Sequence, residues 1–286
     1  MARRCTASIN LNAIKKNYLY AKSLSPNTKA IAIVKANAYG HGAIEVAGHL
    51  EDCADCYGVA CTEEAIELRN SGIDKTPILL MEGVFEVSEV KLIEKYNLIV
   101  TLCNSKQLQW LLDNTFNKPV DVFVKYDSGM GRLGFQGEEF INAINLLEEN
   151  EKIGQITLMT HFSSADDINS TSTNEQISNF DKTLYSKKYS ASLANSAAIM
   201  SLSESHREYT RPGIMLYGSS PFPEKTFLNK LTPAMTLSSV LISIKSFKAG
   251  QSIGYGSRYT CKQDMQIGVV AIGYADGYPR SAIDGT

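Results

Sequence analysis

The sequence contains no hydrophobic run near the roughly 20 apolar residues that a membrane-spanning helix requires. Its N-terminus lacks the apolar stretch of a secretory signal, because two arginines are followed by Thr6, Ser8 and Asn10. Neither sign of charge predominates, with Lys+Arg 28 against Asp+Glu 30, so no net basic surface for nucleic acid is indicated. We therefore expect a cytoplasmic protein whose partners include neither a membrane nor nucleic acid.

A complete set of metal ligands is also lacking. Cys53 and Cys56 have the C-x-x-C spacing found in zinc sites, but no second pair of ligands follows at a fitting distance. The chain has Cys 6 in all, and these suit free thiols in a reducing compartment. We therefore expect no metal.

What the sequence does contain is the composition of an ordered globular protein. Hydrophobic residues make up 44% of the chain and charged residues 20%, which argues against disorder. A length of 286 residues fits either one large barrel or two domains.

Short apolar runs alternate along the chain with segments of helical periodicity. Several runs are almost continuously apolar, as expected for parallel strands that are buried on both faces. Helices are indicated between them, one starting at Thr62 and another at Asn104 or Ser105. The eight candidate strands are residues 30–35, 56–60, 77–81, 98–103, 120–125, 156–160, 189–194 and 211–216. This order predicts an α/β fold built on a closed (β/α)8 TIM barrel, with an open doubly wound sheet as the alternative.

The pattern changes after Tyr217. Residues 219–233 contain three prolines and are typical of a linker. The apolar segments beyond it have no helix between them and indicate strands, at residues 236–247, 252–255 and 267–274. We therefore predict a barrel over residues 1–220 and the beginning of an all-β C-terminal domain over residues 221–286, which ends after about three strands.

Lys35 stands at the end of the first predicted strand. Active sites of barrels lie at the carboxyl ends of the strands, so this amine is expected at a mouth walled by apolar strands. Desolvation there disfavours the charged form and makes the amine a better nucleophile, as a Schiff-base lysine requires. On local sequence alone, the same lysine could equally extend its ammonium into solvent.

The stretch from Val34 to Gly42 resembles the pyridoxal-phosphate signature of the alanine racemase family at every position. The resemblance continues in order along essentially the whole chain. The other motifs that carry it are residues 125–134, 160–166, 194–198, 211–218, 254–256 and 273–280. These motifs in register are more specific than any single one, and they imply a racemase that uses pyridoxal 5'-phosphate.

The resemblance implies two catalytic residues. Lys35 would form the internal aldimine and exchange the α-proton on one face of the substrate. Tyr255 would act on the opposite face, donated by the other subunit of a homodimer; taken alone, it would be a turn aromatic between two glycines. A phenol needs a cationic or hydrogen-bonding setting to act near neutrality. Two-base proton transfer would interconvert L-alanine and D-alanine and supply D-alanine for bacterial peptidoglycan.

The resemblance also implies the residues around cofactor and substrate. Arg211 would face the pyridine nitrogen and, as a charged donor, keep that nitrogen unprotonated. Arg132 would bind the substrate carboxylate or the cofactor phenolic oxygen, and Lys125, which is carbamylated in several relatives, would orient it. Tyr274 would line the substrate access channel. Hydroxyls and backbone N–H groups after the eighth strand would bind the phosphate. The remaining cofactor-binding residues would be Tyr39, His161, Asn195, Ser196, Gly213 and Ile214.

Other interpretations stay open. Arg211 could form a surface salt bridge, and His161 could be a structural histidine at a strand end. For the whole protein, the alternatives are a decarboxylase of the same plan, a broader-specificity amino-acid racemase, or a non-catalytic pyridoxal-phosphate-binding protein. Arg211 argues against the decarboxylase, which usually places an acid at the pyridine nitrogen. Tyr255 and Tyr274 argue against the binding protein, because such proteins lack a β-domain.

The family's pattern continues beyond Thr286. A later Met-Asp pair, and a late tyrosine that contacts the phosphate, have no counterpart in this sequence. We therefore expect a C-terminally truncated chain with an exposed sheet edge, whose activity is weak or absent.

Overall fold

The computed structural model describes residues 4–183, 188–222 and 230–282. The chain divides into two compact units, one of residues 10–234 and the other of residues 1–9 together with 235–286. Each unit is described by itself below.

The first strand of the chain belongs to the C-terminal unit, which differs from the predicted division at residue 220. β1 (Cys5–Ile9) pairs antiparallel with β10 (Met235–Ser239), from Cys5 opposite Ser239 to Ile9 opposite Met235. The barrel closes without β1, and the backbone groups of this segment find their partners in β10 of the same unit.

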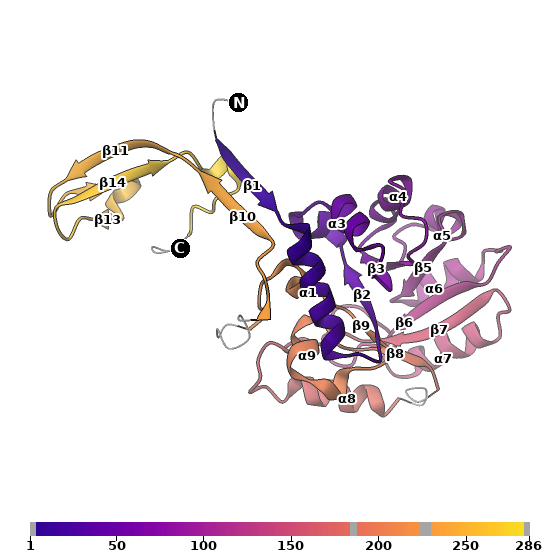
Figure 1. Ribbon diagram of the computed structural model, residues 1–286. Helices are drawn as coiled ribbons and strands as arrows, with labels where there is room; N and C mark the ends of the chain where they lie inside the picture. Colours follow the sequence, from indigo (N-terminus) through magenta and orange to yellow (C-terminus); the bar gives the residue numbers. More distant parts are fainter. Residues whose placement is uncertain (1–3, 184–187, 223–229, 283–286) are drawn as a thin grey trace. The chain divides into compact units, whose positions relative to one another are not determined.

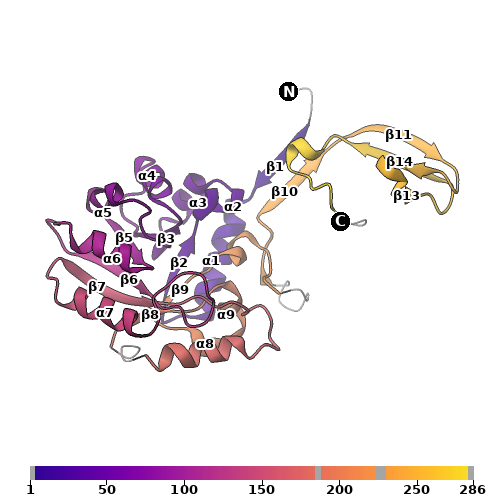
Figure 2. The same cartoon turned by 180° about the vertical axis from the view of Figure 1, so that it is seen from behind.

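Within the described residues, eight strands close into a parallel barrel in which β9 lies beside β2 (Figures 1 and 2). The strands are β2 (Lys29–Ile33), β3 (Cys56–Val59), β4 (Ile78–Leu80), β5 (Leu98–Leu102), β6 (Val120–Lys125), β7 (Ile153–Met159), β8 (Ser190–Ser192) and β9 (Tyr209–Thr210). Closure confirms the predicted (β/α)8 barrel and rules out the open doubly wound sheet.

The eighth strand was misplaced by the sequence pattern. It is β9, two residues long, whereas most of the predicted range 211–216 is an irregular turn followed by the 3-10 helix η3 (Ile214–Tyr217). Pro212 has no N–H to donate to a sheet ladder, so an apolar run containing it cannot continue as an interior strand. The chain instead leaves the barrel at its mouth, where its backbone can face a ligand.

Helices follow most of the strands and lie outside the barrel (Figure 2). They are α1 (Leu11–Leu24), α2 (Lys35–Gly40), α3 (Ala43–Leu50), α4 (Thr62–Asn70), α5 (Val90–Lys95), α6 (Ser105–Leu112), α7 (Gly137–Glu148), α8 (Ser172–Asp181) and α9 (Ser196–Ser201), with short 3-10 turns η1 (Val87–Glu89) and η2 (Ser203–Ser205). The predicted helix starts at Thr62 and Asn104 are confirmed. The Asn104 side chain caps α6 by accepting a hydrogen bond of 2.9 Å from the Gln107 N–H.

The barrel interior is filled by side chains from β2, β3, β4, β6 and β7. Its buried cluster consists of Ile31, Ile33, Cys56, Leu79, Phe123 and Met159. Packing of this kind leaves no channel through the barrel and supports the strand ends as rigid positions for functional groups.

The segment after β2 has an unusual backbone. Ala36, Asn37, Ala38 and Tyr39 all have φ between 52° and 54°, although none is glycine. Left-handed conformation costs about 1–2 kcal/mol per L-residue, so surrounding contacts must hold it. Glu64 accepts the Ala36 N–H at 2.7 Å, and the Asn37 side chain accepts the Ala43 N–H at 2.8 Å. This turn places Lys35 and Tyr39 on the same side, toward the barrel mouth.

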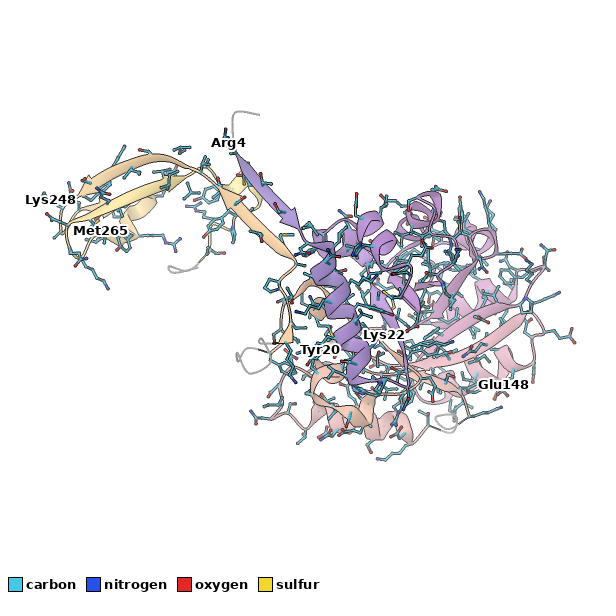
Figure 3. All side chains as sticks on the ribbon, in the orientation of Figure 1. Arg4, Tyr20, Lys22, Glu148, Lys248 and Met265 are labelled. Carbon is cyan, nitrogen blue, oxygen red and sulfur yellow. The ribbon has the colours of Figure 1, made fainter. Side chains whose placement is uncertain are left out.

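The C-terminal unit consists of short antiparallel pairs. β11 (Leu241–Phe247) pairs with β14 (Met265–Val270), and Lys248 and Met265 lie at one end of this antiparallel pair (Figure 3). β12 (Ser252–Ile253) pairs with β13 (Tyr259–Thr260). The predicted β character is confirmed, but two predicted strands end early, in the 3-10 turns η5 (Tyr255–Ser257) and η6 (Tyr274–Asp276). No helix among the described residues has the length and apolar character needed to cross a membrane.

Candidate active site

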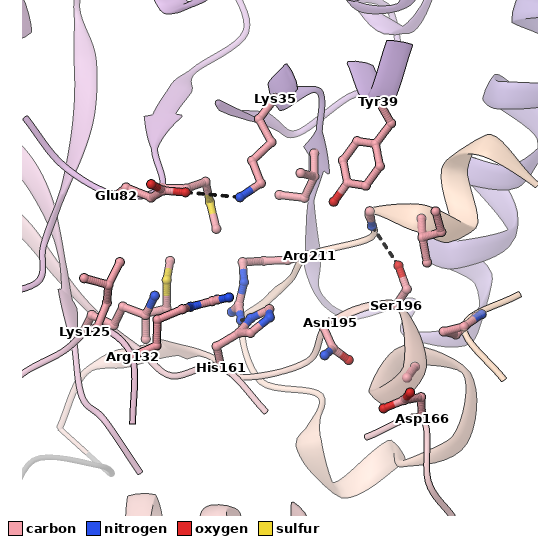
Figure 4. A pocket seen from close by; sticks show the side chains of 18 residues that line it. Lys35, Tyr39, Glu82, Lys125, Arg132, His161, Asp166, Asn195, Ser196 and Arg211 are labelled. Carbon is pink, nitrogen blue, oxygen red and sulfur yellow. Dashed lines mark hydrogen bonds and ion pairs between the residues drawn. The ribbon is translucent and has the colours of Figure 1, made fainter. Parts of the chain in front are cut away.

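A cavity of about 460 Å³ opens at the carboxyl ends of the barrel strands, and we call it the mouth cavity (Figure 4). All the cofactor residues and barrel substrate residues predicted from the sequence line it. They are Lys35, Tyr39, Lys125, Arg132, His161, Asn195, Ser196, Arg211, Gly213 and Ile214. Lys125 and Arg132 lie at one end of the view in Figure 4, and Tyr39 and Ser196 lie at the other.

Lys35 points across the mouth cavity to a carboxylate. Its Nζ lies 3.2 Å from Oε1 of Glu82, and each of the two side chains is 34% exposed. The amine therefore lies at the mouth formed by the strand ends, as the sequence predicted, and meets a carboxylate there in addition. The alternative of an ammonium extended into bulk solvent does not hold.

Glu82 was missed by the sequence analysis. It stands two residues after the end of β4, at the same edge of the barrel at which Lys35 stands two residues after the end of β2. The rule that singled out Lys35, a polar residue at the carboxyl end of a buried strand, applies equally to Met81-Glu82-Gly83 and would have found it.

Arg211 is buried and holds three strand ends together. Its Nη1 donates to the carbonyl and hydroxyl oxygens of Ser192 at 2.7 and 2.6 Å, and its Nη2 donates to the carbonyl oxygens of Thr160 at 2.7 Å and Leu193 at 3.1 Å. Burial lowers the pKa of its guanidinium to about 10, so the group stays charged. The surface salt bridge considered for this arginine is excluded.

The Nε of Arg211 is the one guanidinium nitrogen left over. It is buried and has no hydrogen-bond partner among the described residues. An unpaired buried donor is costly, and one that lines a cavity is suited to an acceptor atom of a bound molecule.

His161 lies beside Arg211 and is held neutral. Burial lowers its pKa to about 2, and the positive charges of Arg211 and Lys125 act in the same direction. Its Nδ1 lies 3.2 Å from Nη2 of Arg211. Because a guanidinium can only donate, Nδ1 is the acceptor, so the proton of the neutral ring sits on Nε2.

This neutral histidine gives the fold a sensitivity to acid. In the unfolded chain the pKa of His161 is about 6.5. Below that pH the unfolded state binds a proton at His161, and the folded state does not. We expect the free energy of unfolding to fall as the pH drops below about 6.5, by up to about 1.4 kcal/mol per pH unit from this group. Urea unfolding of the wild type and of His161→Gln between about pH 5 and 6.5 measures it. Equal slopes in the two proteins would contradict the assignment.

Lys125, at the end of β6, is buried without a counter-ion. Among the described residues no hydrogen bond or ion pair to its ammonium is found. Burial lowers its pKa, and the charges of Arg211 and Arg132 add to this effect. At a given pH, a larger fraction of Lys125 is therefore in the neutral amine form than for an ordinary surface lysine.

Arg132 is presented by a tight loop after β6. The Asp127 carboxylate accepts the N–H groups of Gly129 at 3.1 Å, Met130 at 2.9 Å and Gly131 at 3.0 Å. Burial acts to raise the pKa of Asp127, but these donors outweigh it and hold that pKa below its usual range. The guanidinium of Arg132 is exposed and lines the mouth cavity, free to bind an anion.

The other end of the mouth cavity is built for an anion. The Ser196 Oγ accepts the Gly213 N–H at 2.8 Å, which leaves its hydroxyl hydrogen free to donate. A Cβ added at Gly213 would lie 3.2 Å from the Tyr39 hydroxyl and 3.8 Å from the Ser196 Oγ, so the glycine keeps this space open. Asn195 caps α9, its side chain accepting from the Ala198 N–H at 3.1 Å. That bond orients the N-terminus of α9 toward the cavity.

Tyr255 and Tyr274 belong to the C-terminal unit and are not part of the mouth cavity as the barrel forms it. Their side chains are 83% and 60% exposed. Each stands in a 3-10 turn, next to a glycine at Gly254 and Gly273.

Comparison with known proteins identifies the same plan. The family model for the alanine racemase N-terminal domain matches residues 9–221, and that for the C-terminal domain matches residues 234–286. The alanine racemase of Azoarcus sp. (strain BH72) is 43% identical over 99% of this chain and 79% of its own length. The catabolic alanine racemase of Pseudomonas putida is 41% identical with the same coverage.

Solved structures agree in fold. The biosynthetic alanine racemase from Pseudomonas aeruginosa superposes with a TM-score of 0.94 at 40% identity, over 99% of this chain and 79% of that one. The alanine racemase from E. faecalis gives 0.86 at 34% identity, over 97% of this chain and 77% of that one. Both family models, the relatives and the structures confirm the resemblance read from the motifs, and the chain belongs to the alanine racemase family.

Proposed function

We propose that this chain interconverts L-alanine and D-alanine with pyridoxal 5'-phosphate held covalently by Lys35. The observation that carries the proposal is the mouth cavity itself, which is lined by Lys35 and by Arg211, whose buried Nε has no hydrogen-bond partner among the described residues. Membership of the alanine racemase family supports the substrate. The product would supply D-alanine for peptidoglycan, in the cytoplasm of a bacterium.

The residues of the mouth cavity fit this cofactor. Its phosphate suits the Ser196 hydroxyl, the Tyr39 hydroxyl and the N–H of Ile214 around the space that Gly213 keeps open. Its pyridine nitrogen is an acceptor for the unpaired Nε of Arg211. When bound, pyridoxal phosphate supplies an electron sink that weakens the bond from Cα of the amino acid to its hydrogen.

Each protein group then has a definite task. Lys35 exchanges the α-proton on one face of the substrate, because its amine enters the mouth cavity from the end of β2. Arg132 binds the substrate carboxylate, for which a guanidinium has matching geometry. Arg211 stays charged and only donates, so it holds the pyridine nitrogen unprotonated and restrains side reactions. Tyr255 of a partner subunit would serve the opposite face, in a homodimer, with Tyr274 along the access channel.

Proton exchange tests the proposal directly. The full chain with added pyridoxal phosphate is incubated in D₂O with L-alanine or with D-alanine, and α-deuterium and optical rotation are followed. We expect both enantiomers to exchange and to racemise. Serine and lysine run in parallel reveal a broader racemase if they react equally fast. A chain that binds the cofactor yet exchanges neither enantiomer of any of the three would support the non-catalytic alternative and contradict the proposal.

Removing one base should separate the two faces. We expect Tyr255→Phe to reduce racemisation about 100-fold or more, since a positioned acid–base group contributes on this order. Exchange of one enantiomer with retention should persist, because Lys35 is intact. Tyr259→Phe, in the next strand of the same unit, is the matched control and should leave both rates unchanged. Equal loss of exchange for both enantiomers in Tyr255→Phe would argue against the two-base assignment.

Lys125 should capture carbon dioxide. Its neutral amine adds to CO₂, a proton leaves, and the resulting carbamate is an anion next to Arg132 and Arg211. We expect a carbamate signal in ¹³C NMR after equilibration with ¹³C-bicarbonate, lost in Lys125→Arg and retained in Lys152→Arg. A spectrum without this signal in the wild type would disprove the modification.

A further inference from the structure

We infer that Glu82 is the counter-ion of Lys35, which holds the ammonium form in place and stabilises it whenever the lysine carries a proton. The inference rests on the proposed function for its role in turnover. Glu82 is thereby a positioning residue: it acts on the reacting nitrogen through a charge, not on the substrate.

The charges of the mouth cavity make such a partner necessary. Lys35 shares the cavity with the guanidinium groups of Arg132 and Arg211, and the carboxylates that line it are Glu82 and Asp166. Glu82 is the one that contacts the lysine, with Oε1 at 3.2 Å from Nζ. Without it, each proton that Lys35 accepts would add to an uncompensated positive field.

The turn that carries Glu82 is fixed by a buried amide. Gln107, on α6, donates from Nε2 to the carbonyl oxygens of Glu82 at 2.9 Å and Val84 at 3.0 Å, while its Oε1 accepts the Cys103 N–H at 2.8 Å. Both N–H groups of the Gln107 side chain and one lone pair of its oxygen are therefore used to join the segments that follow β4 and β5.

Gly83 allows this close approach. Its φ is +79°, and a Cβ there would lie 2.3 Å from the Thr101 carbonyl oxygen and 2.6 Å from the Gln107 Nε2. No side chain fits at this position, so the backbone can pass against β5 and aim Glu82 into the cavity. The backbone of the turn is therefore fixed at the cavity edge, and from there the Glu82 carboxylate contacts Lys35.

The chemistry of Lys35 gives this contact a purpose. Acting as a base, the amine takes a proton from carbon and becomes an ammonium; acting as an acid, it returns that proton. Glu82 offsets the repulsion that the ammonium meets from the guanidinium groups of Arg132 and Arg211, so the protonated state remains accessible during turnover. Loss of the charge should lower kcat more than it raises KM, because Glu82 stabilises a catalytic state and not the bound substrate.

Acylation of the cofactor-free full chain tests the pair without any turnover. Only neutral amines react with acetic anhydride, so the carboxylate protects Lys35 by keeping it charged. We expect Lys35 in Glu82→Gln to be acetylated about fivefold faster than in the wild type at one pH, as quantified by mass spectrometry, a value scaled to a partly exposed pair. Glu82→Asp, which keeps the charge, should fall between them. Glu82→Met replaces the glutamine variant if that protein does not fold.

A second ion pair of the same unit provides the matched control. Lys15 Nζ lies 2.7 Å from Oδ2 of Asp52 on the surface. Asp52→Asn removes the same charge from the protein and should speed the acetylation of Lys15 while leaving that of Lys35 unchanged. Equal or slower acetylation of Lys35 in Glu82→Gln would overturn the inference. If acetylation responds as expected but alanine is not racemised, the ion pair stands and the proposed function fails.

Discussion

Lys35→Ala is expected to abolish racemisation, with a loss of about 10⁴-fold or more. The substitution removes both the covalent anchor of the cofactor and the base on one face, and each alone contributes two or more orders of magnitude in enzymes. The visible absorption band of the covalently held cofactor should disappear in the same protein. Absorption spectra and the D₂O exchange assay measure the two effects.

The control separates chemistry from folding. Lys152→Ala removes an exposed lysine far from the mouth cavity and should retain both the band and the activity. Phosphate binding should survive in Lys35→Ala, because the Ser196 hydroxyl and the space at Gly213 are untouched. A visible band that persists in Lys35→Ala would show that another amine holds the aldehyde.

Arg211→Met should destabilise the barrel unit by about 3 kcal/mol or more. The variant leaves the carbonyl oxygens of Thr160 and Leu193 buried without this donor, and each orphaned group costs about 1–3 kcal/mol before relaxation. The Ser192 carbonyl oxygen loses one of its two donors and keeps the Thr160 N–H. Entry of water and relief of the repulsion with Lys125 offset part of this loss. Urea denaturation followed by circular dichroism measures the change in the free energy of unfolding.

Arg207→Met is the matched comparison. Arg207 Nη2 contacts Asp181 at 3.0 Å on the surface, where an ion pair contributes about 0–1 kcal/mol. Similar destabilisation by the two substitutions would mean that the hydrogen bonds of Arg211 stabilise the fold no more than a surface ion pair does. Arg211→Met also removes the guanidinium next to the His161 ring, so we expect the pKa of His161 to rise in this variant. Arg207→Met should leave that pKa unchanged.

Strand ends predicted most of these site residues. Lys35, Lys125, His161 and Asn195 stand at or next to the ends of predicted strands, and parallel strands deliver such positions to one edge of a barrel. Arg211 stood at the start of the predicted eighth strand, so only the motif resemblance assigned it to the site. Motif resemblance then assigned their chemistry, which spacing alone does not specify.

Glu82 and the eighth strand show where that reasoning ended. The strand-end rule can place Glu82 at the barrel mouth, but it does not say what the carboxylate contacts. The ion pair with Lys35 was recognised only from the distance in the structure. The run at 211–216 has the composition of a strand, but Pro212 and the irregular backbone of Gly213 shape a turn that only the surrounding barrel stabilises.

The sequence by itself determined the barrel, the β-rich C-terminal segment and the set of residues at the mouth, because burial on both faces and strand-end position leave local traces in residue order. Tertiary structure decided the rest: the left-handed run at 36–39, the pairing of β1 with β10, the ion pair between Lys35 and Glu82, and the lowered pKa values of His161 and Lys125. Those properties depend on which groups distant in the chain come within a few ångströms of one another. No local pattern of residues records such distances, since they follow from packing of the whole barrel.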